Sequence, residues 1–224
     1  MKIICPILAD FDIGDRDAVR AAFADAPTLH MQQAWRDAPE EKFLPARVRI
    51  GWRADRFLVF GELTDEHLFT QATEDNQILC SFGDVFEIFL RDLEGESYAE
   101  FHVAPNGKRL QLMWPDAETI RRAGNMEVSI DDLKIGKPIF DFSQWSEGKT
   151  WCICASVPCS AFPSVGTSLE GRRWLASFSR YDYASAEEPP VLSSTSPHAE
   201  VSFHRQQEWT EVLFSEKIEL VRTQ

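Results

Sequence analysis

The sequence predicts an all-β protein: a two-sheet antiparallel β-sandwich, jelly-roll-like, with minor helical decorations. Short runs in which apolar and polar residues alternate recur along the chain, and this period of two is typical of strands that bury one face. Clusters of turn residues separate the runs, as between the strands of a sandwich. The chain of 224 residues is long enough to bury a sizeable core, and sandwiches of this length are commonly one domain. We therefore predict a single domain over residues 1–224.

The individual elements follow from these runs. We expect strands within residues 47 to 63, 84 to 91, 98 to 114, 150 to 157, 173 to 181 and 209 to 220. Asn106-Gly107 stands between two runs, and this dipeptide is the strongest short-range signal for a β-hairpin. Helical periodicity occurs only in 15–26 and 65–75, which predicts two short helices. The stretch 184–200 is rich in Ser, Pro and acidic residues and predicts a long surface loop.

The charge balance argues against two classes of partner. The formal net charge is −13, and no run of Lys or Arg offsets it locally. Phosphate backbones and anionic membrane surfaces are therefore repelled. No apolar run approaches the roughly 20 residues that span a bilayer. We expect a soluble protein that binds neither nucleic acid nor membrane.

Cysteine usage and the first residues indicate the compartment. The chain has five cysteines, and an odd number favours a reducing environment over a disulfide framework. The first residues, MKIICPILADFDIGDRD, lack the long apolar core and small-residue cleavage site of a signal peptide. We expect a cytoplasmic protein, with secretion left open. Cys152, Cys154 and Cys159 have metal-ligand chemistry, but small thiols that fill a sheet are far commoner.

One residue interrupts the strand pattern. The run GDVFEIFLRD, residues 83–92, reads as a strand with two apolar faces, yet Glu87 lies between Val85 and Phe89 on one of them. A carboxylate in apolar surroundings loses hydration, so it needs partners or takes up a proton. Glu87 is therefore a candidate site residue. We expect it to be ionised and paired with a basic group on the neighbouring hairpin.

The hairpin that follows offers such partners. With a side-chain period of two, the first strand of the hairpin directs three polar side chains to one face, and we expect the second strand to add more. The predicted polar row consists of Glu87, Tyr98, Glu100, His102, Arg109, Gln111 and Met113. Planar polar groups suit the vicinal hydroxyls of a sugar, and flat rings suit its C–H faces. The alternative is a solvated sheet face with ordinary cross-strand ion pairs.

Several of these runs together resemble a known family. GDVFEIFLRD, YAEFHVAPNGK, RRWLASFSRYDY and FHRQQEWTEVLF occur in this order. They are similar to the pattern of the family 9 carbohydrate-binding modules, within the DOMON-like β-sandwich group, from about Arg47 to Phe214. The resemblance implies a β-sandwich, a non-catalytic role in binding a mono- or oligosaccharide and, in some members, structural calcium.

The resemblance also implies where the sugar binds. Glu87 falls on the acid that lines the site in those members, and His102 and Ser179 fall on two of their other polar positions. Phe203 falls near one of two aromatic walls, with a shallow sugar-sized depression expected beside it, and Ser81 falls near the other. The candidate ligand-binding residues are Glu87, Tyr98, His102, Arg109, Gln111, Ser179 and Phe203.

A haem or electron-transfer domain is a second hypothesis. Other DOMON-like sandwiches hold haem between Met and His ligands, and His198, His204, Met113 and Met126 supply those atom types. The commoner interpretation of such residues is surface His and core Met.

A glycoside hydrolase is a third hypothesis. It needs two carboxylates about 5 to 10 Å apart, for which Glu87 and Glu100 are the candidates. The metal content stays open, although acidic residues near one predicted loop carry the oxygens that calcium prefers. These residues are Asp65, Glu66, Glu74 and Asp75. Acidic runs in loops are usually just solvated.

Overall fold

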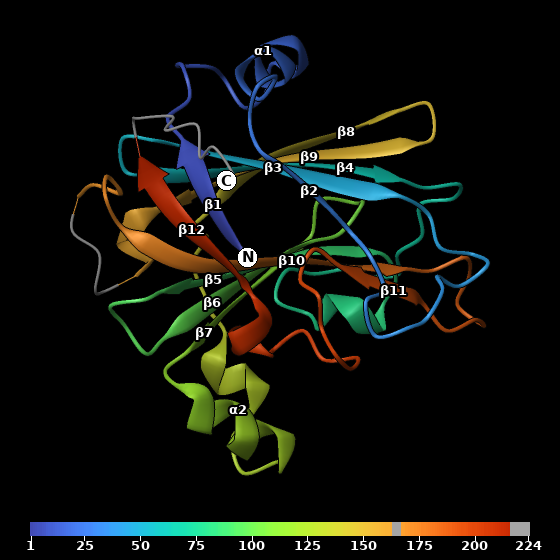
Figure 1. Ribbon diagram of the computed structural model, residues 1–224. Helices are drawn as coiled ribbons and strands as arrows, with labels where there is room; N and C mark the ends of the chain where they lie inside the picture. Colours follow the sequence, from blue (N-terminus) through green and yellow to red (C-terminus); the bar gives the residue numbers. More distant parts are fainter. Residues whose placement is uncertain (163–166, 216–224) are drawn as a thin grey trace.

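Two β-sheets packed face to face make up the protein in a computed structural model that describes residues 1–162 and 167–215 (Figure 1). The seven-stranded sheet contains, in spatial order, β1 (Lys2–Pro6), β12 (Thr210–Ser215), β10 (Arg173–Asp182), β5 (Val85–Asp92), β6 (Tyr98–Val103) and β7 (Arg109–Trp114), with β11 (Val191–Ser194) also paired to β10. The five-stranded sheet contains β2 (Thr28–His30), β3 (Ala46–Arg53), β4 (Arg56–Thr64), β9 (Thr150–Pro158) and β8 (Asp141–Glu147). The predicted all-β sandwich is confirmed.

The main core lies between the two sheets. Phe86 and Ile88 of β5 point inward, as does Phe101 of β6. Val59 of β4 and Ile153 of β9 belong to the same cluster from the five-stranded sheet. These five side chains are fully buried, and burying each contributes roughly 1.5 to 3 kcal/mol to folding. The period-two alternation in the sequence therefore builds this core.

Helix α1 (Arg16–Ala22) covers the outer face of the five-stranded sheet. It begins at Asp15, whose side chain accepts two backbone hydrogen bonds of the first turn, as an N-cap residue does. Val19 packs into the same cluster as Phe60 of β4. The helix predicted within 15–26 is confirmed.

Helix α2 (Ala117–Gly124) lies against the outer face of the seven-stranded sheet, at the bottom of Figure 1. Asp116 caps it by accepting a hydrogen bond from Thr119 N at 2.7 Å. This helix was not predicted, because its only large apolar side chain is Ile120. That side chain packs on the sheet, so tertiary contact through a single large apolar residue stabilises this short helix.

The second predicted helix, 65–75, is wrong. Backbone N–H groups of this stretch bond to side chains instead of helical carbonyl groups. The Gln77 side chain accepts hydrogen bonds from Thr73 N and Glu74 N, and Asp65 accepts one from His67 N. Such local side-chain acceptors compete with helix formation.

The hairpin between β6 and β7 has a longer loop than the Asn106-Gly107 signal predicts. The loop spans residues 104–108, and Val103 pairs with Arg109. A two-residue turn would shift this register by one residue. Because side chains alternate along a strand, that shift exchanges the two faces of β7. The prediction that Arg109 and Gln111 share a face with the polar row is therefore wrong.

Arg109 and Gln111 lie on the opposite face, toward the five-stranded sheet. The Arg109 guanidinium donates to the Phe140 carbonyl group at 2.8 Å and lies 4.7 Å from the ring centroid of Phe142. The Gln111 side chain accepts a hydrogen bond from Ile139 N at 2.8 Å. Both side chains fix the chain segment that leads into β8.

Other strand predictions match the observed sheets, with three differences. The predicted loop 184–200 contains β11, which pairs with β10. Strands β1, β2 and β8 were not predicted. Strand β12 is described as far as Ser215, and the predicted strand residues 216–220 lie outside the described residues. No helix within the described part of the chain is long and apolar enough to cross a membrane.

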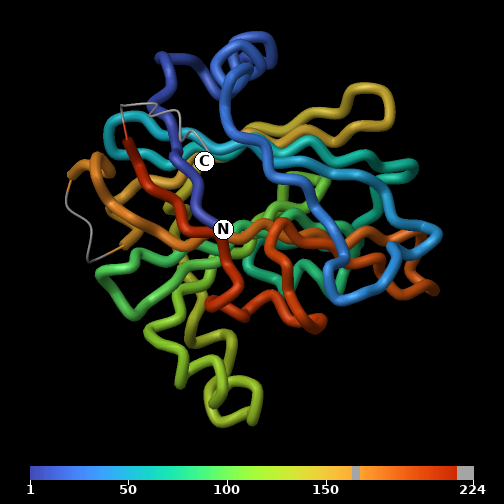
Figure 2. The backbone as a smooth tube through the Cα atoms, viewed as in Figure 1, coloured from blue at the N-terminus to red at the C-terminus, as the bar shows by residue number. Residues whose placement is uncertain are grey.

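Strand β1 closes one edge of the seven-stranded sheet. It pairs in parallel with β12, from Lys2 opposite Glu211 to Pro6 opposite Ser215 (Figure 2). Strand β12 pairs on its other side with β10. The backbone groups of β12 that would otherwise form an open edge are therefore paired.

Candidate functional site

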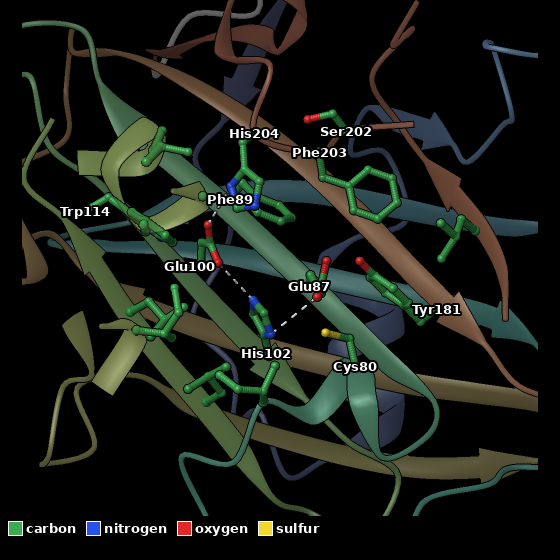
Figure 3. A pocket seen from close by; sticks show the side chains of 18 of the residues that line it. Cys80, Glu87, Phe89, Glu100, His102, Trp114, Tyr181, Ser202, Phe203 and His204 are labelled. Atoms are coloured by element: carbon green, nitrogen blue, oxygen red, sulfur yellow. Dashed lines mark ion pairs between the residues drawn. The ribbon is translucent and has the colours of Figure 1, made fainter. Parts of the chain in front are cut away.

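A cavity of about 450 Å³ lies on the outer face of the seven-stranded sheet (Figure 3). Its volume is in the range of small-molecule sites, roughly 300 to 1,000 Å³. Strands β5, β6, β7 and β10 supply the floor, and α2 and the segment 201–204 supply walls. The polar groups of the lining include Glu87, Glu100, His102 and His204. We call this cavity the central cavity.

The strand register brings Glu87 and His102 together. They are directly opposite on β5 and β6, and Glu87 Oε1 lies 3.4 Å from His102 Nδ1. The other ring nitrogen, Nε2, lies 3.4 Å from Glu100 Oε2. The imidazole therefore stands between two carboxylates, as the dashed lines in Figure 3 show. Neither nitrogen has hydrogen-bond geometry with a described protein group.

Glu87 is buried but not satisfied. Its residue is 3% exposed, and no described residue donates a hydrogen bond to its carboxylate. Burial raises the pKa of Glu87 to about 7, against the opposing attraction of His102. Buried polar groups are almost always hydrogen-bonded, so this carboxylate has acceptor capacity directed to the cavity that it lines.

Glu100 is a different carboxylate in the same floor. Tyr98 Oη donates to its Oε1 at 2.9 Å, and His204 Nδ1 lies 3.1 Å from that atom. Burial would raise the pKa of Glu100, but the imidazoles of His204 and His102 outweigh it and hold the pKa well below the usual range. The same carboxylates raise the pKa of both imidazoles, against the effect of burial. Glu100 is thus ionised and paired.

Aromatic rings surround the polar floor. Phe203 lies with its ring centroid 5.7 Å from that of Tyr181 and 6.4 Å from that of Phe89. Trp114 stacks on Tyr98 at 5.8 Å, and its Nε1 is buried without a hydrogen-bond partner among the described residues. The cavity therefore offers ring faces together with unused polar atoms.

Three of the predicted site residues line the central cavity: Glu87, His102 and Phe203. Tyr98 lies beneath it, fully buried, and positions Glu100. Ser179 is opposite Glu87 on β10, but its hydroxyl donates to Ser194 at 3.2 Å. His102 is a basic group of the neighbouring hairpin and lies 3.4 Å from Glu87, but burial raises the pKa of Glu87 to about 7, so the expected fully ionised pair is not present at neutral pH. Phe203, near which a depression was expected, lines the central cavity.

Several lining residues were not among the predicted site residues. Tyr181 follows Ser179 at the spacing of one strand face, so the strand period was a signal that could have found it. Trp114 is present because of the register of β7. Ile120 is present because of α2, and nothing in the sequence pattern places that helix over the sheet.

The residues of the haem hypothesis are not grouped in one place. Met113 packs toward the core between the sheets, and Met126 is 93% exposed. His198 is fully buried and lies 3.0 Å from Glu208. Only His204 of these four lines the central cavity, so they do not form an axial ligand pair.

The acidic residues considered for calcium are also separated. Asp65 forms a cluster with Asp84 and Asp182, whose carboxylate oxygens lie within 4.8 Å of one another. Arg180 is buried among them, with its guanidinium 2.7 Å from Asp65 and 3.1 Å from Asp182. A guanidinium already supplies the compensating positive charge, so these residues do not fit a resident cation. Glu66 instead pairs with Lys149 at 2.8 Å.

We therefore expect calcium to leave this cluster unaffected. The Tm of the purified protein should be the same in excess calcium chloride and in excess EDTA, because Arg180 takes the place that a cation would need. A calcium-dependent rise in Tm that Asp182→Asn abolishes would contradict this assignment.

The cysteines do not form a metal site either. Cys152 and Cys154 pack on the outer face of the five-stranded sheet with α1, whereas Cys159 belongs to the core between the sheets. All five cysteines are free thiols.

Several solved structures, including the following three, have a fold similar to that of this chain. A Bacteroides uniformis ATCC 8492 protein with a provisional description as carbohydrate-binding superposes with a TM-score of 0.74 at 16% identity, over 96% of this chain and 99% of that one. A family 9 carbohydrate-binding module from Caldicellulosiruptor kristjanssonii, in complex with cellotriose, gives 0.65 at 12% identity, over 100% and 98%. The chain has the fold of the family 9 carbohydrate-binding modules. A family 9 module from Caldicellulosiruptor kristjanssonii in complex with glucose superposes with a TM-score of 0.63 at 12% identity, over 100% of both chains.

These likenesses confirm the family 9 fold that the sequence resemblance implied. No protein-family profile matches the chain, and no curated protein matches it. At these identities the comparison defines the fold, and the function has to be argued from the site.

Proposed function

We propose that the protein is a non-catalytic carbohydrate-binding protein whose saccharide lies in the central cavity. The observation that carries this proposal is Glu87: a buried carboxylate, lining a cavity, with no protein hydrogen-bond donor among the described residues. A sugar hydroxyl donates hydrogen bonds of the required kind, and a ring of apolar C–H groups packs on aromatic faces. Two solved structures with this fold hold glucose and cellotriose, which supports the same ligand class here.

The geometry of the floor favours binding over hydrolysis. A glycosidase places its acid and its second carboxylate on either side of the scissile bond. Here His102 stands between Glu87 and Glu100, 3.4 Å from each, where that bond would have to lie. The imidazole can instead act with both carboxylates as one row of donors and acceptors.

Calorimetric titration with a panel of mono- and oligosaccharides tests the proposal. We expect the wild type to bind a saccharide, and we expect Ala123→Phe to weaken this binding at least about 10-fold. Ala123 of α2 lines the cavity, and a phenyl ring at this position would fill it. Arg122→Phe is the matched control, since Arg122 is the preceding residue of the same helix and is not a lining residue.

If Ala123→Phe binds the saccharide as tightly as the wild type does, the saccharide binds elsewhere on the protein. No heat with any sugar of the panel at millimolar concentration would overturn the proposal. Release of reducing ends from an oligosaccharide, abolished by Glu87→Gln, would show catalysis instead.

A further inference from the structure

A second cavity, of about 560 Å³, opens beside the central cavity. The two share Ile120, Ser202 and His204 as lining residues, so one ligand can extend from the first into the second. Strand β5 serves both: Glu87 lines the central cavity, and Arg91 lines the second on the same strand face. Their Cα atoms are about 13 Å apart at the usual rise of a strand, which is an oligosaccharide span.

The second cavity is basic in a protein with a net charge of −13. Its charged lining consists of three arginines and His204, and within the described residues no aspartate or glutamate lines it. Arg205 is neutralised by Glu208, which it binds through two 2.8 Å hydrogen bonds. Arg121 is paired with Glu118 in the same bidentate way.

Arg91 differs from these two arginines. Its guanidinium donates to two neutral acceptors, Gln206 Oε1 at 2.7 Å and the Gly95 carbonyl group at 3.3 Å. No carboxylate of the described residues pairs with it. These two contacts use Nη1 and Nε, so Nη2 remains free to donate. Arg91 is therefore a half-buried, oriented and uncompensated positive charge, of the kind that binds a planar anion through a pair of hydrogen bonds.

His204 adds a second donor at the junction of the cavities. Its Nδ1 is held by Tyr98 Oη at 2.9 Å and by Glu100 at 3.1 Å. Its Nε2 has no protein partner in the described part of the chain. Burial lowers the pKa of His204, but the Glu100 carboxylate outweighs burial and raises it, so the ring takes up its proton at a higher pH than an ordinary histidine does.

We propose that the ligand is an anionic oligosaccharide, with one unit against Glu87 and a carboxylate or sulfate ester bound by Arg91 in the second cavity. This inference rests on the proposed function of the central cavity. The acidic floor of the central cavity does not repel such a ligand, because the charge of Glu100 faces two imidazoles. The anionic group of the ligand binds at Arg91, at the other end of β5 from Glu87.

Titration with matched disaccharides tests the proposal. The probes are neutral disaccharides of glucose, galactose and mannose, their counterparts oxidised to the uronic acid at one C6, and their C6 sulfate esters. At low ionic strength we expect at least one anionic form to bind roughly 10- to 100-fold more tightly than its neutral parent, the usual effect of one charge-assisted hydrogen-bonded contact. The uronate and sulfate arms distinguish the two anions.

Arg91→Gln should abolish this preference, so that anionic and neutral probes bind with similar affinity. Arg122→Gln removes one positive charge from α2 outside both cavities and should leave the preference intact. Unfolding curves of both variants establish that they are folded. High salt should reduce the preference of the wild type.

The outcomes separate this inference from the proposed function. Equal affinity for neutral and anionic probes, or a preference that survives Arg91→Gln, overturns the anionic ligand and leaves saccharide binding in place. No binding of any probe, neutral or anionic, overturns both.

Discussion

Glu87→Gln should make the protein more stable at about pH 8, by roughly 3 kcal/mol. Burial raises the pKa of Glu87 to about 7 in the folded protein, whereas in the unfolded chain it returns to its ordinary value. The folded state therefore binds a proton that the unfolded state has lost, and the ionised carboxylate destabilises the fold above the folded-state pKa. Glutamine has the same shape without the charge. At about pH 5 the gain should fall below about 1 kcal/mol.

Denaturant unfolding at the two pH values measures this difference. Glu147→Gln is the control, because Glu147 is an exposed carboxylate at the end of β8 and should change stability little at either pH. A loss of stability for Glu87→Gln at pH 8 would show that the pair with His102 stabilises the fold, contrary to our expectation.

The same substitution should weaken saccharide binding by about 1 to 3 kcal/mol at pH 8, the contribution of a hydrogen bond to a charged acceptor. At pH 5 wild-type Glu87 holds its proton, so the difference between wild type and variant should shrink. Together, these two results would show that Glu87 serves ligand binding at the expense of stability. Equal affinity of both proteins at pH 8 would remove Glu87 from the binding site.

Arg180→Met should destabilise the protein by about 3 to 5 kcal/mol at pH 8, because it leaves buried carboxylates without their partner. Arg180 is 1% exposed, and it joins the two sheets by donating to the Thr64 carbonyl group at the end of β4. Burial already raises the pKa of Asp84 to about 7 and that of Asp182 to about 6. Protonation of these groups relieves the repulsion, so the loss should be smaller at pH 5.

Arg173→Met is the matched control on the same strand. Arg173 pairs with Glu211 at 2.7 Å on the surface, and exposed pairs contribute only about 0 to 1 kcal/mol. Unfolding of both variants at pH 5 and pH 8 makes the comparison. A loss below about 1 kcal/mol for Arg180→Met at pH 8 would contradict a structural role for the buried cluster.

The sandwich could be predicted because period-two alternation is a local property of each strand. Phe86, Ile88 and Phe101 fill the core, as their spacing indicates. The face of β7 could not be predicted in the same way, because it depends on the length of one loop. The hairpin loop 104–108 places Arg109 opposite Val103, and a loop shorter by one residue would have exchanged the faces.

The site was predictable to the extent that it rests on one strand pair. Glu87 and His102 could be found because a polar residue in an apolar strand needs a partner on the next strand. His204 and Ile120 could not, since they reach the cavity from segments whose position depends on tertiary packing. Arg91 was visible as a strand residue, but only the structure shows that no carboxylate among the described residues pairs with it.

The pairing of β1 with β12 also sets the order in which the protein can be completed. Strand β1 is synthesised well before its partner, which begins at Thr210, so the roughly 200 residues between them must be made before the two strands can meet. Pairings between such distant segments form slowly, because the intervening chain loses much entropy on closure. Until the two strands pair, β12 leaves an open edge on the growing sheet, and Cys5 of β1, fully buried in the folded protein, is not yet enclosed in the core.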